Sequence, residues 1–179
     1  RFCPVETPEG TEIGLRKNLA LLARISTSVI IDEEKLFKSL EELGLKRERG
    51  ENDVEGKFDV FYNGIFIGST IDEKKIIDDV KNRRRQGQLP IEISVRLDKY
   101  FNSILISTEI GRVLRPIIIV DNGISRLKDE HIVLLEEGKI KWDNLLTQGV
   151  IEYIDAAEED NALVALYEDD LTHAHTHLE

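Results

Sequence analysis

Three glutamates near the start of the chain have the residue type and spacing for acid–base chemistry. Glu6, Glu9 and Glu12 lie three residues apart. A pair such as Glu6 and Glu9 could hydrolyse a bond if a pocket raised the pKa of one carboxyl group, which would then serve as general acid. The spacing places no His, Ser or Cys partner beside them, so a carboxylate hydrolase stays an alternative hypothesis. Catalytic turnover that is lost in the Glu6→Gln or the Glu9→Gln variant would support it.

Three histidines near the other end of the chain could bind a metal. His173, His175 and His177 alternate, so in a strand all three imidazoles would face one side, as in a zinc or nickel cluster. A structural zinc site usually has four ligands with Cys among them, whereas the only cysteine is Cys3. The acidic run 168–170 lacks the alternating oxygen ligands and the glycine of a calcium loop, which favours a solvated turn. We therefore expect no metal site and no bound cofactor in this chain.

Two groups of cationic residues could contact nucleic acid or acidic protein. Arg16 and Lys17 follow the glutamates, and Lys81 with residues 83–85 lies near the end of a predicted helix. The alternative in both cases is a solvated set of charges. At 83–85 the favoured interpretation is solvated arginines that match the negative end of the helix dipole.

Turn and capping residues define the elements that position these side chains. Pro4 and Pro8 bias the first segment toward extended backbone, and the apolar residues 19–25 that follow fit either a strand or a helix. Asp32 and Asp72 are predicted to cap two helices that end near residues 44 and 87. The polar stretch 46–57 predicts a mobile connection, and Asn63-Gly64 predicts a hairpin.

The second half of the chain is predicted to alternate strands and short helices. Strands are expected at 91–97, 103–108 and 113–120, and the continuous apolar run 117–120 indicates a central strand buried on both faces. Helices follow at 128–137 and 142–148, then a strand at 150–156 that packs beside 162–165 across an acidic loop at 158–160. The predicted fold is α+β: a mixed, mainly antiparallel sheet with packed helices, preceded by an irregular proline-rich segment.

Composition and charge restrict the function further. The 179 residues are 41% apolar and 33% charged, typical of a soluble globular chain, and no apolar run approaches the roughly 18 residues of a membrane-spanning helix. The net charge is −11, with ten Asp or Glu residues and no Lys or Arg from Trp142 to Glu179. The isolated chain should therefore bind nucleic acid poorly. The absence of any Met, even at position 1, predicts a fragment of a longer protein.

A family resemblance extends over the chain. The run Cys-Pro-x-Glu-Thr-Pro-Glu-Gly at 3–10, followed by Gly14-Leu15 and Asn18-Leu19, resembles the fork region of the second-largest subunit of cellular multi-subunit RNA polymerases. Similar segments follow in the family's order at 62–64, 83–87, 111–116, 149–156 and 176–179. Gly-Arg-x-x-Arg-Pro followed by Glu-Tyr-Ile-Asp-Ala is similar to the archaeal or eukaryotic subunit rather than the bacterial one.

The resemblance implies a non-catalytic part of DNA-directed RNA polymerase that lines and supports the active-centre cleft. The complete enzyme performs template-directed nucleotidyl transfer with magnesium ions, and its main metal ligands belong to the largest subunit. This chain is then expected to have no activity alone. Implied partners are the largest subunit, the rest of the second-largest subunit, the DNA template and RNA, in the archaeal cytoplasm or the eukaryotic nucleus. The implied nucleic-acid-proximal residues are Arg1, Glu6, Thr7, Glu9, Gly10, Arg16 and Lys17.

The same resemblance suggests three domains: a fork segment at 1–28, an external domain with hairpins and two helices at 29–122, and a second external or fork-return segment at 123–179. It implies a structural role for Arg112 and Arg115. Residues 1–25 of an excised fork are expected to lack their packing partners. The alternative from another functional class is an autonomous acidic α+β protein-interaction module.

Overall fold

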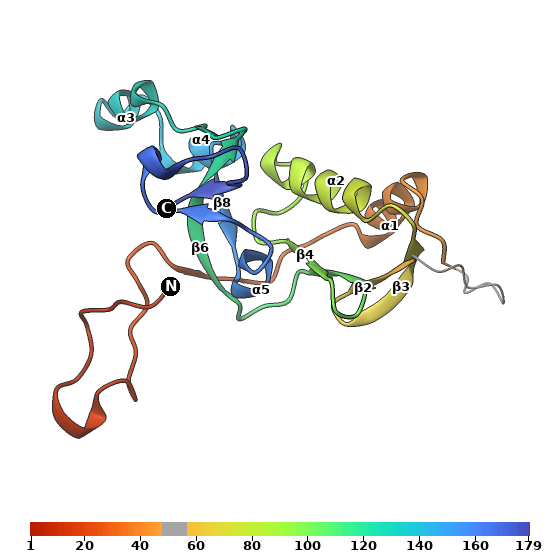
Figure 1. Cartoon of the computed structure of the whole chain (residues 1–179), viewed down its shortest axis with the longest axis horizontal. Coiled ribbons are helices and arrows are strands. Elements are labelled where there is room, and N and C mark those ends of the chain that lie inside the picture. The colour runs from red at the N-terminus through yellow and green to blue at the C-terminus, as the bar shows by residue number, and fades with distance from the viewer. Residues whose placement is uncertain (48–56) are drawn as a thin grey trace.

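The computed structural model describes residues 1–47 and 57–179, which form two bodies side by side with an N-terminal loop extending from one of them (Figure 1). The first body holds the two longer helices and a four-stranded sheet. The second holds the remaining helices and a second sheet. The α+β class with mainly antiparallel pairing is confirmed, although the strands divide into two sheets rather than one.

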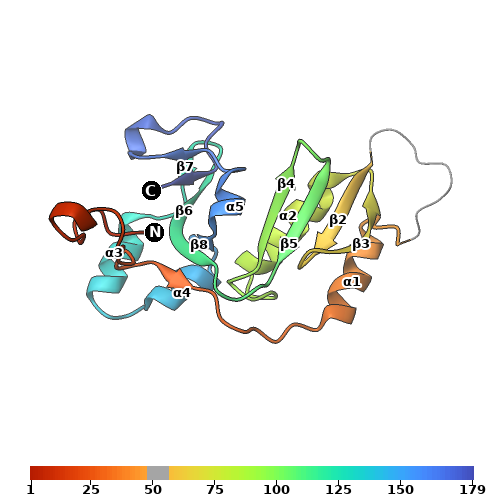
Figure 2. The same ribbon diagram turned by 90° about the horizontal axis from the view of Figure 1, so that it is seen from below.

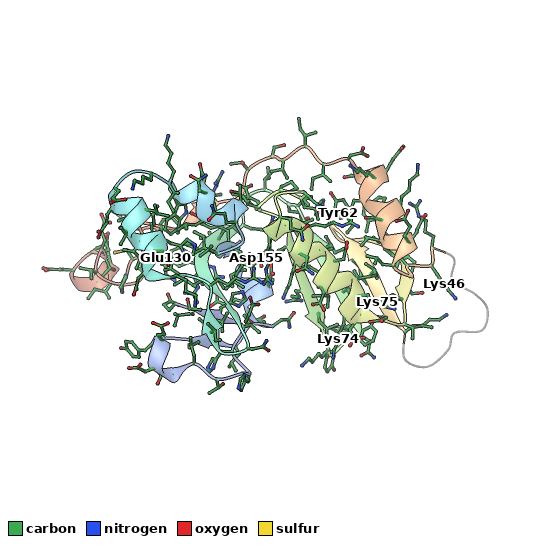
Figure 3. The ribbon with its side chains drawn as sticks, turned by 90° about the horizontal axis from the view of Figure 1, so that it is seen from above. Lys46, Tyr62, Lys74, Lys75, Glu130 and Asp155 are labelled. Carbon is green, nitrogen blue, oxygen red and sulfur yellow. The ribbon has the colours of Figure 1, made fainter. Side chains whose placement is uncertain are left out.

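The first body is a sheet with two helices packed on one face. The helices are α1 (Glu33–Glu42) and α2 (Glu73–Arg85), and the strands are β2 (Phe58–Tyr62), β3 (Ile65–Thr70), β4 (Ser94–Asp98) and β5 (Ser103–Ser107). The strand order is β3-β2-β5-β4, with only the central pair β2 and β5 parallel. Both helices contribute to one buried core with the strands. Figure 2 looks onto the sheet with α2 behind it, and Figure 3 shows α2 from the opposite side.

The local signals that predicted these elements are confirmed. The Asp32 and Asp72 carboxylates each accept a hydrogen bond from the backbone N–H three residues on, at 3.0 and 3.2 Å. Asn63 and Gly64 have φ values of 47° and 77°, as a tight hairpin turn between β2 and β3 requires. Asn102 and Asn122 adopt positive φ in the same way, and Asn122-Gly123 forms a second such hairpin between β6 and β7 that the sequence analysis did not identify.

Each edge strand of the four-stranded sheet is hydrogen-bonded on its outer side by one residue from outside the sheet. At β3, the Lys46 and Ser69 backbones exchange two hydrogen bonds of 2.8 Å, next to Gly68. At β4, the Asn161 side chain accepts from the Leu97 N–H at 2.6 Å and donates to the Leu97 carbonyl at 3.0 Å. These contacts occupy edge groups that would otherwise be open to another strand. Lys46 begins the stretch predicted to be mobile, and residues 48–56 of that stretch lie outside the described residues.

The second body is built around β6 (Val113–Asp121). This strand pairs antiparallel with β1 (Arg24–Ile25), β7 (Ile124–Ser125), β8 (Ile151–Ile154) and β10 (His177–Leu178), and β9 (Val164–Ala165) pairs parallel with β10. Helices α3 (Asp129–Glu136), α4 (Trp142–Thr147) and α5 (Ala156–Glu159) connect these strands. The central position predicted for 117–120 is confirmed. The strand β6 thus lies in one sheet with the C-terminal strands. The ion pairs described below join this second body to the first.

Three predictions about local structure are wrong. The strand β8 does not lie beside β9, because β6 and β10 separate them. The acidic residues 158–160 do not form a simple loop, since the Asp155 side chain caps α5 through the Glu158 N–H at 2.8 Å. The strand expected at 91–97 begins at Ser94, because Ile91 packs in the core of the second body while Ile93 packs in the first.

The domain ranges 1–28, 29–122 and 123–179 stay predictions. Among the described residues, none of the helices is both long and apolar enough to cross a membrane.

Candidate functional site

The candidate site is the N-terminal loop, residues 1–25, which we call the arm. Its two limbs lie antiparallel: the Cys3 N–H donates to the Asn18 carbonyl at 2.9 Å, and the Ala20 N–H donates to the Arg1 carbonyl at 2.8 Å. Figure 1 shows the arm extending away from the second body, with a 3-10 turn (Gly10–Glu12) at its far end. Gly10 has a φ of 80°, in the left-handed region where a side chain is strained.

Polar contacts stiffen the arm beyond its paired limbs. The Asn18 side-chain amide donates to the Glu6 carbonyl at 3.0 Å, and the Thr7 hydroxyl accepts from the Gly14 N–H at 3.4 Å.

No helix forms at 19–25, so the helical alternative for that segment is wrong. Only Arg24 and Ile25 pair as a strand, opposite Leu114 and Val113 of β6.

The base of the arm is held to the second body by Arg1. Its guanidinium donates to the Val113 carbonyl at 3.1 Å and to the Ile154 carbonyl at 3.4 Å, and it forms an ion pair of 2.5 Å with Glu159. Burial alone would raise the pKa of Glu159, but Arg115 and Arg1 together lower it. The cation of Arg1 is therefore engaged inside the protein, where it fixes the first residue of the arm.

The other residues predicted to lie near nucleic acid are all on the arm beyond this base. Glu6, Thr7, Glu9 and Gly10 are exposed along its outer half. Arg16 faces Glu12 at 3.4 Å with both side chains largely exposed, and the Lys17 ammonium lies 5.5 Å from the centroid of the Phe2 ring. The structure thus gathers six of the seven residues on one projecting loop, while Arg1 belongs to its anchor. A nucleic-acid contact by any of them stays a prediction.

The arm also exposes apolar side chains over its whole length. Leu21 is 99% exposed and Val5 is 85% exposed, and several others are more than 40% exposed: Phe2, Ile13, Leu15, Leu19, Leu22 and Ile25. Exposed apolar surface on this scale is typical of a segment that packs against another protein body. The exposure of these side chains is what we expect if residues 1–25 lack their packing partners in this chain.

A buried ion-pair network joins the two bodies. Arg84 of α2 is 2% exposed and donates to Glu158 at 2.7 and 2.8 Å and to Glu152 at 2.5 Å. Arg85 donates to the other Glu152 oxygen at 2.6 Å, and His177 lies 2.8 Å from that same oxygen. Burial alone would raise the pKa of Glu152, but Arg84, His177 and Arg85 hold it well below its usual range.

These contacts contradict the prediction made for residues 83–85. Arg84 is neither a solvated cation at the end of a helix nor a contact for an outside partner. Its guanidinium forms ion pairs with Glu152 and Glu158 inside the protein. Arg83 is half-buried and pairs with Asp79 one turn back on the same helix, so it is the least enclosed member of an ion pair but not a free solvated cation. Sequence reasoning missed Arg84 because the acidic partners lie about seventy residues further along the chain.

A second set of contacts at the same junction involves Arg112, which precedes β6, and Arg115 within that strand. Arg112 donates to Asp155 at 2.7 Å, to the Ser94 hydroxyl at 3.0 Å and to the Glu92 carbonyl at 2.5 Å. Asp155, labelled in Figure 3, lies between the two bodies. Burial alone would raise the pKa of Asp155, but the Glu158 N–H and Arg112 lower it. Arg115 pairs with Glu159 and with Glu179. Both arginines serve inside the fold, as the resemblance implied.

The histidine alternation does not gather three imidazoles. His177 is buried in β10 against Glu152, whereas His173 and His175 lie in the preceding loop, where His175 accepts from the Thr172 N–H at 3.0 Å. Residues 168–170 form an exposed 3-10 turn. Within residues 1–47 and 57–179, no three His, Cys, Asp or Glu side chains are grouped so that they could hold a metal ion.

Three family models, which describe consecutive domains of one protein, match this chain. The model described as RNA polymerase Rpb2, domain 3, matches residues 1–25; domain 4 matches residues 60–121; and domain 5 matches residues 142–179. The chain belongs to the Rpb2 family of RNA polymerase subunits.

Curated relatives of this family align over nearly the whole chain. It is 42% identical over 192 residues to the DNA-directed RNA polymerase subunit Rpo2 of Sulfolobus acidocaldarius, an alignment that covers 100% of this chain and 17% of the relative. It is 35% identical over 182 residues to subunit RPC2 of RNA polymerase III from Schizosaccharomyces pombe, covering 99% of this chain and 16% of the relative. The chain therefore spans about a sixth of the length of these relatives.

The Rpb2 domain matches place the ion pairs between two domains, although their bounds differ from those of the two bodies. The domain 3 match coincides with the arm. The domain 4 match runs from β2 through β6 and contains Arg84, Arg85 and Arg112, while the domain 5 match contains Glu152 and their other acidic partners. The buried network thus joins Rpb2 domain 4 to domain 5, and Arg1 joins the arm to both through Val113 and Glu159.

Proposed function

We propose that this chain is a non-catalytic region of the second-largest subunit of a DNA-directed RNA polymerase, where it lines and supports the active-centre cleft. The observation that carries the proposal is the succession of three Rpb2 domain matches in order along the chain. The identity of 42% to an archaeal Rpo2 over the whole chain supports the same assignment. An autonomous acidic module unrelated to transcription has no comparable support.

The geometry suits a structural role with one projecting element. The arm carries exposed apolar and charged residues on a loop whose base is pinned by Arg1. In the assembled subunit, the apolar side chains of the arm pack against neighbouring protein. Its outer half, with Glu6, Thr7, Glu9, Gly10, Arg16 and Lys17, lies beside the nucleic acids.

Magnesium and the chemical step belong to the complete enzyme. On this proposal its main metal ligands belong to the largest subunit. The partners of the chain are the largest subunit, the remainder of the second-largest subunit, the DNA template and the RNA. The site of action is the cytoplasm in an archaeon or the nucleus in a eukaryote.

The first experiment tests membership in the polymerase. The full-length protein that contains this chain is affinity-tagged in its own cells and purified. We expect the largest polymerase subunit to co-purify and the complex to synthesise RNA on a DNA template in the presence of magnesium. Purification of the tagged protein without other polymerase subunits would refute the proposal.

A second experiment tests the orientation of the arm. A photo-crosslinking amino acid replaces Lys17 in the full-length subunit of a transcribing complex, and another replaces Tyr100, which is 87% exposed on the β4–β5 turn. We expect crosslinks to DNA or RNA from position 17 and none from position 100. Crosslinks to protein alone from position 17 would refute the nucleic-acid-proximal assignment, while the co-purification would still establish the subunit.

A further inference from the structure

We propose that a groove between α2, the β4–β5 turn and residues 160–163 binds an acidic segment of a partner protein through one apolar side chain and flanking carboxylates. The cavity has a volume of about 580 Å³ and is lined by Ile77, Lys81, residues 96–99 and residues 160–163. This volume lies within the range of natural ligand pockets. The site goes beyond the proposed role of the chain, because it involves no residue of the arm and lies where α2 and β4 of the first body meet residues 160–163 of the second.

Four of the side chains that line the groove are apolar, and we call these four its floor. Ile77 of α2, Leu97 of β4 and Ala162 are partly buried, and Leu163 is 48% exposed. These side chains come from three separate elements that meet along one cavity. A floor of this kind gains free energy by burying an aliphatic side chain of a ligand.

The charge on the walls favours an acidic ligand. Arg96 is offset by Asp98 at 3.2 Å and by Asp160 at 3.9 Å. Lys81 and Lys99 form no ion pair with any described residue, so they remain as surplus cations in a chain with a net charge of −11. Two unpaired ammonium groups beside an apolar floor are complementary to carboxylates that flank an apolar residue.

The groove is already formed. The Asn161 side chain makes both backbone hydrogen bonds of Leu97, at 2.6 and 3.0 Å, and thereby fixes the 160–163 loop to the edge of β4. The ligand therefore meets walls that are held in place, which lowers the ordering cost of binding.

These features favour an acidic peptide over a nucleic acid. The described residues that line the groove include no aromatic side chain on which a base could stack, whereas its apolar side chains can bury an aliphatic residue. A peptide carboxylate next to a leucine uses both the lysines and the floor.

The test measures binding of a fluorescent peptide, built from alternating pairs of acidic residues and single leucines, to the 179-residue chain by fluorescence anisotropy. The decisive variant is Lys81→Ala/Lys99→Ala. The matched control is Lys38→Ala/Lys74→Ala, which changes the net charge equally at exposed lysines of α1 and α2 outside the groove, with Lys74 labelled in Figure 3. We expect the groove variant to weaken binding roughly tenfold and the control to change it less than about twofold.

A second pair of variants tests the apolar floor. Leu163→Asp places a negative charge in the groove, whereas Leu166→Asp places one on an exposed neighbour outside it. Only Leu163→Asp should abolish binding, and circular dichroism should show both variants folded, because neither leucine is buried. A peptide with serine in place of leucine should bind at least fivefold more weakly.

Several outcomes would overturn the proposal: no binding by the unmodified chain, equal losses in the two lysine variants, or equal affinity for the serine peptide. Tighter binding of a single-stranded oligonucleotide that the groove variant abolishes would reassign the site to nucleic acid. Because the peptide is offered to the chain itself, each result stands whether or not the polymerase proposal holds.

Discussion

Replacing Arg84 by Met should destabilise the chain far more than the same change at its neighbour Arg83. Arg84 is 2% exposed and supplies the only recorded side-chain donors to the Glu158 carboxylate among the described residues, at 2.7 and 2.8 Å. Glu152 keeps Arg85 and His177 after the substitution, whereas Glu158 stays buried with an uncompensated charge. Met fills much of the same space without restoring a donor.

The expected magnitude follows from the burial of the pair. Removing one partner of a buried ion pair costs about 3–5 kcal/mol of folding free energy, because the other charge is left desolvated. Arg83 pairs with Asp79 at 2.8 Å, with side chains that are 27% and 22% exposed, one turn away on the same helix. Such a pair contributes at most ~1 kcal/mol, so Arg83→Met serves as the matched control.

Urea unfolding of the chain at neutral pH, followed by circular dichroism, measures both variants. We expect the midpoint for Arg84→Met to fall by at least about three times as much as that for Arg83→Met, with little change in slope. In a double-mutant cycle, Arg84→Met/Glu158→Leu should be more stable than the sum of the single changes predicts, by ~1–3 kcal/mol. Equal costs at Arg84 and Arg83, or strict additivity in the cycle, would refute the assignment of a buried network.

Three further predictions concern pH, packing and the arm. The pKa of Glu152 is lower in the folded state than in the unfolded state, where it is about 4.3. Its contribution to the free energy of unfolding is therefore present above pH 4.3 and is lost as the pH falls through the folded-state pKa. Glu152→Gln should make the free energy of unfolding less dependent on pH in this acidic range. Gly68→Ala should cost roughly 2–3 kcal/mol in urea unfolding, since a Cβ there would lie 2.5 Å from the Lys46 carbonyl oxygen at a φ of 152°; an unchanged midpoint would contradict this. Arg1→Ala should speed hydrogen exchange of the Ala20 N–H while leaving β2–β5 protected, and unchanged exchange on the arm would show that Arg1 is not its anchor.

Local structure could be predicted from the sequence because its causes are local. The caps at Asp32 and Asp72 and the turn at Asn63-Gly64 each depend on a few consecutive residues, and each forms where the sequence places it. The continuous apolar run at 117–120 likewise predicts its central, buried position, because a strand covered on both faces has no polar side. The class of the fold follows from these elements.

Strand neighbours and site geometry could not be predicted in the same way. Periodicity gives no partner for a short strand, so β8 and β9, adjacent in sequence, lie on different sides of the strand pair β6–β10. The histidine alternation fails for a related reason, because only His177 falls within a strand and its two predecessors lie in a turn. Tertiary contacts decide both cases, and these are not encoded in the spacing of neighbouring residues.

The family resemblance supplied what spacing could not. It covered segments from the arm to residue 179, and the domain matches confirm it. It could not show how the arm is held. The structure holds the arm at its base through Arg1, yet leaves apolar residues such as Leu21 in solvent. Anchoring and exposure together describe a loop that is positioned by this chain and that presents an apolar surface to solvent.

The uneven distribution of charge along the sequence is largely resolved inside the fold. The segment from Trp142 to Glu179 holds ten acidic residues and no Lys or Arg, which taken alone suggests an acidic surface. Six of the ten instead pair with arginines that precede residue 116, and they are Glu152, Asp155, Glu158, Glu159, Asp160 and Glu179. Charge complementarity between distant segments thus joins the C-terminal part to the arm, α2, β4 and β6. A run of one sign in a sequence therefore identifies an outside partner only after the opposite charges within the same chain have been counted.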